Sequence, residues 1–499
     1  MMQNRSALTS LRGKFDDGRR IATPGVLAVI GAIVCALHVA ASPAQAESTD
    51  RPNVILVMAD DQGWGDVGYN GHPAIQTPQL DQAAAEAVRF DRFYAAAPVC
   101  SPTRCSVLTG RNPNRSAVYA WGWPIRPQEI TLAERLQQAG YATGHFGKWH
   151  LGSVRRDSPV NPGKCGFDRW VSAPNFYDND PVLCDQGRAV QYEGESSDVT
   201  ADLAIDWIRK QAETDHPFLA VVWFGSPHNP HIAAEADRRL YEKEPKKFRD
   251  YYGEMTGIDR AYGKIRQTLK ELDLRDNTIL WYCSDNGAEK ARGSAGPFRQ
   301  KKGSIYEGGL LVPAILEWPA RFAKPQATAI RATTCDILPT VAAAAGLSDD
   351  GQPRLDGVNL LPLLEANQTT RPEAIGFWQM AIRGISTPSD SLMRDLMAAQ
   401  ADGGDLSADE VSQNAAKLPQ PPTSKQSLQG HAALIDGNWK LHRIENKKGE
   451  VRFELYDLAA DPYEKKNVLK QHPQVVAKLK KMQHAWQISV IDSINGADY

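Results

Sequence analysis

Four continuous apolar runs recur along the chain, and each of them ends in a cluster of polar residues. The runs span residues 53–61, 140–150, 218–231 and 277–287. Runs of this kind are typical of parallel strands that are covered on both faces. The stretches at 77–88, 131–139, 197–214 and 250–272 have the spacing of amphipathic helices. Strands that alternate with helices predict an α/β fold built around a mainly parallel sheet.

The polar residues that end these runs are candidates for a functional site. In run order they are Asp60 and Asp61, Lys148 and His150, His228 and His231, and Asp285 and Asn286. In open α/β sheets, ligands bind beyond the carboxyl ends of the strands. One such cluster alone is typical of a solvated turn. Four runs that all end in charged or histidine side chains favour a single site at one edge of the sheet.

A fifth segment, CSPTRCSVLTGR at residues 100–111, predicts a helix with an anion site at its start. Ser101 suits the N-cap position and Pro102 the first helical position. Cys100 would then lie at the positive end of the helix, where backbone N–H groups favour an anion. Arg104 falls in the first turn. A thiolate would also be stabilised at this place, so the segment leaves a cysteine hydrolase open.

The composition bounds the class of protein. The chain has 499 residues, 23% of them charged, and a formal net charge of −2. This balance is ordinary for a soluble enzyme and argues against nucleic-acid binding. Such a length predicts one large α/β unit with a smaller domain.

The amino terminus has the pattern of a signal peptide over residues 1–46. A basic leader is followed by an apolar stretch at 24–41 and by an A-x-A site that ends at Ala46. The alternative is an uncleaved anchor, because the apolar stretch approaches the length of a membrane span. Cleavage predicts an exported protein, periplasmic or secreted, without a stable membrane anchor. The pair Arg19-Arg20 leaves both the Sec and the twin-arginine routes open.

Export changes what the cysteines mean. Six remain after the leader: Cys100, Cys105, Cys165, Cys184, Cys283 and Cys335. They lack the paired C-x-x-C spacing of a zinc site. Cys165 and Cys184 flank a polar loop, and in an oxidising compartment we expect them to form a disulfide. Cys283 lies in an apolar run and is expected to be a buried free thiol.

The composition shifts near residue 371. Residues 47–371 are predicted to form the catalytic domain, and residues 372–499 a smaller C-terminal domain. A polar stretch near 383–429 is expected to be an insertion or long loop. Residues 431–444 predict a hairpin with Asp436-Gly437 at its turn.

The motifs together resemble the type I, formylglycine-dependent sulfatases, which are arylsulfatase-like members of the alkaline phosphatase superfamily. The signature C-x-P-[S/T]-R, followed by L-T-G-R, matches residues 100–111. Similar segments follow the family order: MADDQGWGD (58–66), GKWHLG (147–152), SPHNPH (226–231), SDNG (284–287), KKGSIYEGG (301–309) and LYDLAADPYEKKNV (455–468). The resemblance implies a large mainly parallel or mixed sheet flanked by helices, with an antiparallel sheet in the smaller C-terminal domain.

The resemblance also implies a modified nucleophile and a metal. Cys100 would be oxidised by a formylglycine-generating maturation enzyme to Cα-formylglycine, whose hydrated gem-diol attacks the sulfate. The implied ligands of one divalent cation are Asp60, Asp61, Asp285, Asn286 and the modified Cys100. Oxygen donors without sulfur or imidazole suit Ca²⁺ better than Mg²⁺.

The remaining implied roles are electrostatic and acid–base. Lys148 and Lys302 would neutralise sulfate oxygens, and Arg104 would steady the gem-diol. His150 would be the base that releases sulfate, and His228 the acid that protonates the leaving oxygen. Lys301 precedes Lys302, and the spacing to YEGG favours Lys302 as the lysine that reaches sulfate.

Other polar residues of these motifs are expected to be structural. They are Asp66, His145 and Arg111, and His231 is expected to be a loop or substrate-contact residue. Gly308 and Gly309 are expected to allow close backbone approach.

The implied activity is hydrolysis of a sulfated carbohydrate or an aryl sulfate. One alternative is a phosphate or phosphonate ester hydrolase of the same superfamily. Another is a non-catalytic protein that binds sulfated glycans with Cys100 unmodified. Two lysines beside a single metal site favour sulfate.

Overall fold

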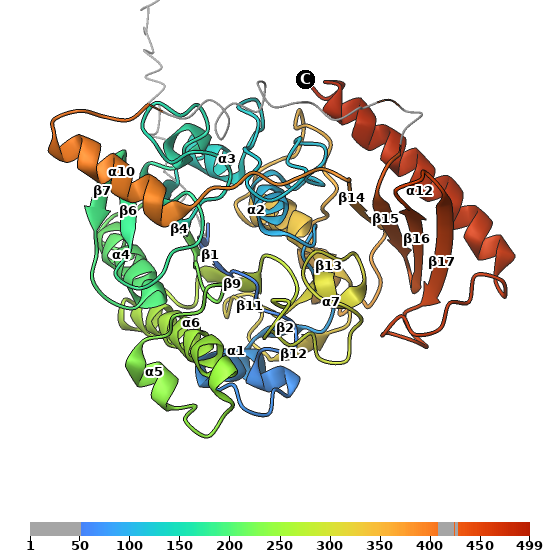
Figure 1. The fold of residues 1–499 in the computed structure, drawn as a ribbon, viewed down its shortest axis with the longest axis horizontal. Helices are drawn as coiled ribbons and strands as arrows, with labels where there is room; N and C mark the ends of the chain where they lie inside the picture. Colours follow the sequence, from blue (N-terminus) through green and yellow to red (C-terminus); the bar gives the residue numbers. More distant parts are fainter. Residues whose placement is uncertain (1–50, 408–423, 425–427) are drawn as a thin grey trace, which may run out of the picture. The chain divides into compact units, whose positions relative to one another are not determined.

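The computed structural model describes residues 51–407, 424 and 428–499 (Figure 1). The predicted signal peptide at residues 1–46 and part of the polar segment near 383–429 lie outside these ranges. Within them, no helix has both the length and the apolar character needed to cross a bilayer.

A ten-stranded mixed sheet forms the centre of this part of the chain, in the order β12-β2-β11-β9-β1-β8-β4-β5-β6-β7. At its middle lie four parallel strands: β9 (Thr278–Ser284), β1 (Asn53–Ala59), β8 (Phe218–Trp223) and β4 (Ala142–Lys148). These are the four predicted apolar runs. On the β9 side follow β11 (Ala314–Glu317), β2 (Val88–Phe90) and β12 (Gln326–Thr328). On the β4 side follow β5 (Arg169–Ala173), β6 (Val182–Asp185) and β7 (Arg188–Gln191).

Helices cover both faces of the sheet, which explains why the middle strands are buried along nearly their whole length. Side chains of β1 alternate between the faces: Ile55 packs with α1 (Pro78–Glu86), α4 (Ser196–Gln211) and α6 (Lys246–Glu271). Leu56 packs on the other face with α2 (Cys100–Thr109), α3 (Leu132–Gln138) and α8 (Ile337–Ala344). Figure 1 shows the two groups on opposite sides of the sheet.

Shorter elements complete the large part. They are β3 (Phe93–Tyr94), β10 (Leu311–Val312) and β13 (Ala332–Thr333), which form a three-stranded sheet, and the helices α5 (Glu235–Arg239), α7 (Glu307–Leu310) and α9 (Leu361–Glu365).

A separate antiparallel sheet lies toward the C-terminus, in the order β14 (Ile375–Gln379), β15 (His431–Asp436), β16 (Trp439–Glu445) and β17 (Val451–Asp457). The helix α12 (Pro473–Ile494) packs on it (Figure 1). The predicted hairpin is confirmed, with Asp436 paired to Trp439 across the turn. The large mixed sheet with its helices and the small antiparallel sheet confirm the predicted fold class.

The described start of the polar segment is not a loop throughout. Ser389–Ala401 forms α10, which lies beside β6 and β7 (Figure 1). Met393 and Leu396 are buried on one face of this helix. Apolar residues three apart share a helix face, so a few of them suffice to dock a helix that is polar on average.

A buried ionic cluster joins the small sheet to the large part. Lys440 on β16 lies 2.8 Å from Glu307 and 3.2 Å from Glu464, and all three side chains are at most 1% exposed. His442 contacts Glu464 at 2.7 Å, and the hydroxyl of Tyr94 donates to Glu307 at 2.8 Å. One buried ammonium group thus compensates two buried carboxylates from different segments.

The predicted disulfide between Cys165 and Cys184 is wrong, because both thiols are free and buried. The Sγ of Cys165 is directed to the carbonyl of Val160, whereas the Sγ of Cys184 lies 3.1 Å from the carbonyl of Val154. Flanking the same loop does not bring two Cβ atoms face to face, which a disulfide requires. Cys283 on β9 is a buried free thiol, as predicted.

Candidate active site

The carboxyl ends of the parallel strands bring the predicted polar clusters together at one rim. Five of these residues are at most 2% exposed: Asp60, Asp61, Lys148, Asp285 and Asn286. The backbone N–H of Asp61 donates to Asp285 at 3.1 Å, which ties the loop after β1 to the loop after β9. Asn286 donates to Asp61 at 2.8 Å. These clusters are therefore not solvated turns.

Helix α2 begins two residues earlier than the N-cap pattern predicts. Cys100 is its first residue, and Val99 precedes it in an extended conformation. Ser101 is not the N-cap, because its hydroxyl accepts a hydrogen bond from the N–H of Gly122 at 2.8 Å. Cys100 still lies at the positive end of the helix and is 1% exposed.

Two lysines reach the carboxylates from different segments. Lys302 Nζ lies 2.7 Å from Asp61, and Lys148, at the end of β4, forms an ion pair with Asp60. Burial alone would raise the pKa of Asp61, but Lys302 and then His228 hold it well below its usual range. Burial alone would lower the pKa of Lys302, but Asp61 and the neighbouring Asp60 and Cys100 together raise it above its usual range. The salt bridge is therefore ionised at neutral pH.

Arg104 ties the signature helix to the loop after β9. Its Nη2 and Nε lie 2.7 and 3.1 Å from the same oxygen of Asp285, and its Nη1 donates to the carbonyl of Lys148 at 3.0 Å. The guanidinium group lies over the ring of Trp223 at 5.2 Å. Arg104 therefore holds the start of α2 against the ends of β4 and β9.

The donor set fits one hard cation. Asp60 Oδ1 and Asn286 Oδ1 are buried and have no hydrogen-bond partner among the described residues. Burial, and then the neighbouring Asp60, raise the pKa of Asp285 to about 6. Unpaired buried oxygens and crowded carboxylates are both costly, and a cation removes both costs. An all-oxygen set from Asp60, Asp61, Asp285 and Asn286 suits Ca²⁺ or Mg²⁺.

Cys100 lies against this donor set. Ligand atoms of Asp60, Asp61, Cys100 and His228 all lie within 4.8 Å of one another. Burial raises the pKa of the Cys100 thiol to about 12, although Lys148 acts against it. Burial thus disfavours the thiolate of the unmodified residue, against the expectation from its place at the helix start. An unmodified Cys100 is a poor nucleophile at neutral pH.

His150 is held in a strained conformation at the end of β4. Its backbone φ is 55°, and it is 3% exposed. Neither ring nitrogen has a hydrogen-bond partner among the described residues. Burial, and then Lys148, lower the pKa of His150 well below its usual range. The imidazole is therefore neutral and can accept a proton from a group bound beside it.

His228 lies where the site reaches the surface. Its side chain is 20% exposed, and its Nε2 is 3.8 Å from Asp61. Burial lowers its pKa to about 4, although Asp61 opposes this. Phe176 stacks on the imidazole with ring centroids 4.1 Å apart. The sequence pattern did not single out Phe176, because it lies in a loop after β5 with no motif of its own.

The residues predicted to be structural make contacts outside this cluster. Asp66 accepts from the backbone of Gly63 and Ser294 and from the hydroxyl of Tyr251. His145 contacts Ser172 at 2.7 Å within a group of aromatic rings.

Arg111 is buried and lies 2.7 Å from Glu129. Lys301 turns away from the site and donates to the carbonyls of Gly293 and Lys290. His231 contacts Glu254 at 3.2 Å.

The loop that carries Lys302 folds back tightly on itself. A Cβ added to Gly309 would lie 2.1 Å from the carbonyl oxygen of Ser304 and 2.6 Å from that of Lys301. A Cβ added to Gly308 would lie 2.2 Å from the carbonyl oxygen of Gln300. The expected close backbone approach is confirmed at both glycines.

Comparison with known proteins places these features in context. The sequence profile of the family described as Sulfatase matches residues 52–347. N-acetylgalactosamine-6-sulfatase of Sus scrofa is 36% identical over 361 residues, which cover 64% of this chain and 67% of that protein. Arylsulfatase A of Homo sapiens is 30% identical over 479 residues, which cover 87% of both chains.

A solved structure agrees with the fold. The crystal structure of Ps i-CgsB in complex with k-i-k-neocarrahexaose matches with a TM-score of 0.73 and 24% identity. The match covers 88% of this chain and 93% of that one. At this identity, the likeness supports the fold alone.

Proposed function

Since the chain belongs to the sulfatase family, we propose that it hydrolyses a sulfate ester at the cluster around Cys100. The observation that carries this proposal is the arrangement of charges. Lys148 pairs with Asp60 and Lys302 with Asp61, and Cys100 lies within 4.8 Å of both carboxylates. Such a cluster can bind a tetrahedral anion beside a nucleophile.

The proposed substrate is a sulfated carbohydrate, with activated aryl sulfates as test substrates. The relatives named above are an N-acetylgalactosamine-6-sulfatase and an arylsulfatase. The cluster is buried except near His228 and Lys302, whose side chains are 20% and 17% exposed. We infer that the sulfate group enters from this side and that the alcohol part stays near His228.

The proposed nucleophile is the hydrated formylglycine form of Cys100, in which two hydroxyl groups stand where the thiol Sγ stands here. One hydroxyl oxygen attacks sulfur, and the bond from sulfur to the alcohol oxygen breaks. His228 gives a proton to that oxygen, because an alkoxide is a poor leaving group. The negative charge of the bound sulfate favours the protonated imidazole, whose pKa is low in the free protein.

Release of sulfate needs the second hydroxyl. His150, neutral in the free protein, takes the proton from it. The carbon–oxygen bond to sulfate then breaks, the aldehyde re-forms, and water hydrates it again. A serine in place of formylglycine would lack this second hydroxyl and would remain sulfated. Splitting hydrolysis into two steps in this way is the principle of covalent catalysis.

One divalent cation completes the proposed site. Asp60, Asp61, Asp285 and Asn286 would hold it, with an oxygen of the modified Cys100. When bound, the cation polarises a sulfate oxygen as a Lewis acid. We propose Ca²⁺ ahead of Mg²⁺, because the donors are carboxylate and amide oxygens and the protein supplies most of them.

Maturation and export also belong to the proposal. Cys100 is 1% exposed, so an enzyme acting on it must reach it before the chain folds. We propose a formylglycine-generating enzyme as this partner, and export to the periplasm or the medium after removal of residues 1–46.

The test is sulfate release by the purified protein and by Cys100→Ala. We expect release from a sugar sulfate by the parent protein and none by the variant, with both proteins folded by circular dichroism. The sulfate, phosphate and phosphonate esters of one aryl alcohol are then compared as substrates. Because they share the leaving group, their rates distinguish a sulfatase from a phosphate or phosphonate ester hydrolase. Faster hydrolysis of the phosphate or phosphonate ester would contradict the proposal. Binding of the sugar sulfate without any turnover would support a non-catalytic glycan-binding protein instead.

A further inference from the structure

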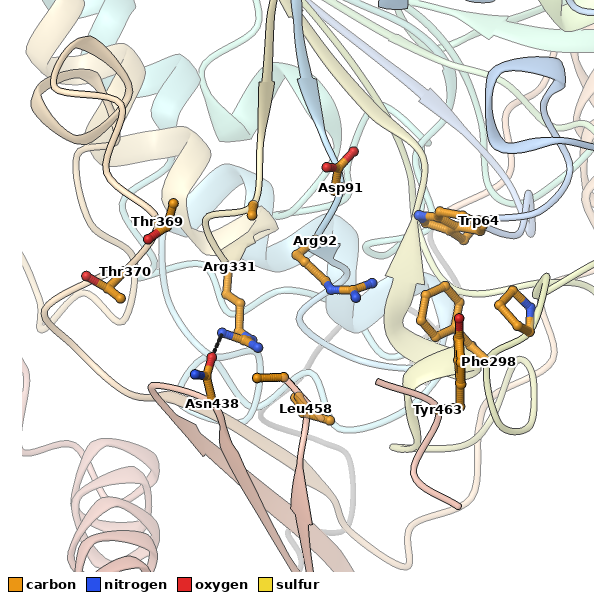
Figure 2. A pocket seen from close by; sticks show the side chains of 13 residues that line it. Trp64, Asp91, Arg92, Phe298, Arg331, Thr369, Thr370, Asn438, Leu458 and Tyr463 are labelled. Atoms are coloured by element: carbon orange, nitrogen blue, oxygen red, sulfur yellow. Dashed lines mark hydrogen bonds between the residues drawn. The ribbon is translucent and has the colours of Figure 1, made fainter. Parts of the chain in front are cut away.

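A second site is indicated by a cavity of about 520 Å³ (Figure 2). None of the residues that line it is a candidate catalytic or metal-binding residue. The lining comes from the loop after β1, the connection from β2 to β3, the loops before α7, β13 and β14, the turn between β15 and β16, and the segment after β17. The volume lies within the ~300–1,000 Å³ of typical ligand pockets.

The charged side chains of this cavity favour an anion. Only Asp91, Arg92 and Arg331 among the lining residues carry charge. Asp91 is paired with Arg89 at 3.2 Å. Within the described part of the chain, neither Arg92 nor Arg331 forms an ion pair; Arg331 donates instead to the amide oxygen of Asn438 at 3.1 Å. Two guanidinium groups are thus left to bind a carboxylate or a sulfate.

The wall of the cavity opposite Arg331 is aromatic. Figure 2 shows Trp64, Phe298 and Tyr463 together on one side, with Arg92 between them and Arg331. The ring of Phe298 lies 5.0 Å from that of Trp64 and 5.7 Å from that of Tyr463, and the guanidinium group of Arg92 lies 5.4 Å from it. Aromatic faces pack well against the C–H groups of a pyranose ring, which are apolar although its hydroxyls are polar.

We propose that this cavity is a non-catalytic binding site for an acidic saccharide. The carboxylate or sulfate of the sugar lies between Arg92 and Arg331, and the ring packs against Tyr463 on the aromatic wall. Asn438 and the hydroxyls of Thr369 and Thr370, on the same side as Arg331, form hydrogen bonds with the sugar hydroxyls (Figure 2). The proposal does not rest on the proposed activity, because binding here needs no sulfate ester.

The test is calorimetric titration of the full protein with an unsulfated chondroitin tetrasaccharide, which carries carboxylates but no ester that a sulfatase could cleave. We expect saturable binding that Arg92→Gln and Arg331→Gln each weaken about tenfold or more, since a charge-assisted hydrogen bond is lost. Arg321→Gln is the matched control, because Arg321 also lies over an aromatic ring, at 5.2 Å from Trp318, but outside the cavity. It should bind as the parent does.

Two further titrations distinguish the sources of binding. Neutral chitotetraose should bind far more weakly, and inorganic sulfate alone should bind more weakly than the acidic tetrasaccharide. Equal affinity for chitotetraose, equal affinity for sulfate, or full binding by both arginine variants would each overturn the proposal. A crystal of the parent protein soaked with the tetrasaccharide checks the position independently of the variants. Saccharide density in the cavity supports the proposal, and an empty cavity at saturating ligand contradicts it.

Discussion

The proposed acid role of His228 gives a quantitative prediction for His228→Ala. The alcohol oxygen of a sugar needs a proton as its bond to sulfur breaks, whereas a nitrophenolate needs little help. General acid catalysis supplies about 10²- to 10⁴-fold, which corresponds to about 3–5.5 kcal/mol of barrier. We therefore expect His228→Ala to slow hydrolysis of a sugar sulfate by that factor and of a nitrophenyl sulfate by much less.

The surroundings of His228 limit what else the change removes. Its Nε2 is 3.8 Å from Asp61, which is beyond a direct hydrogen bond, and its imidazole ring stacks on the ring of Phe176. His231 supplies the control, since its pKa is also lowered to about 4 by burial but its imidazole contacts Glu254. His231→Ala should show no dependence on the leaving group.

The assay compares kcat/KM for both variants on both substrates, with metal content measured in each preparation. Equal losses on the two substrates for His228→Ala would mean that this residue binds sulfate and does not protonate the leaving oxygen. A loss at His231 that depends on the leaving group would move the acid role there.

Three further predictions concern metal, charge and stability. Asp60→Asn should lower the Ca²⁺ content, expected to be about one per chain, and activity should fall with it; a stoichiometric requirement for zinc in metal analysis would contradict the site. Lys302→Ala should reduce kcat/KM by about 10²-fold or more, whereas Lys301→Ala should change it little; equal effects would refute the assignment. Lys440→Met should destabilise the fold by about 3–5 kcal/mol, because it leaves two buried carboxylates without a cation; an unchanged denaturant midpoint would show that they are protonated.

Much of the fold could be predicted because local pattern and burial agree. The strands at 53–59 and 278–284 are apolar except at their ends, since helices cover both faces of the sheet. Parallel strands place their carboxyl ends at the same edge of the sheet. Once the strands were predicted, the meeting of the polar clusters at that edge could be predicted too. The helix at Ser389–Ala401 was not predicted, because only two of its large apolar residues are buried.

The errors arose where tertiary contacts decide. Ser101 has the right chemistry for an N-cap, but its hydroxyl is used by the backbone of Gly122. The thiol of Cys100 lies at a helix start, yet burial raises its pKa. Phe176 stacks on His228, and the second cavity forms, because loops that are far apart in the sequence come into contact. A local sequence pattern does not predict such long-range contacts.

The central claim is that Cys100 works as formylglycine. The most direct measurement is the mass of the tryptic peptide of residues 93–104, taken from a preparation whose sulfate-releasing activity is known. We predict the mass of the aldehyde or of its hydrate, in a proportion that follows specific activity across preparations. An active preparation in which this peptide carries only unmodified cysteine would contradict the account.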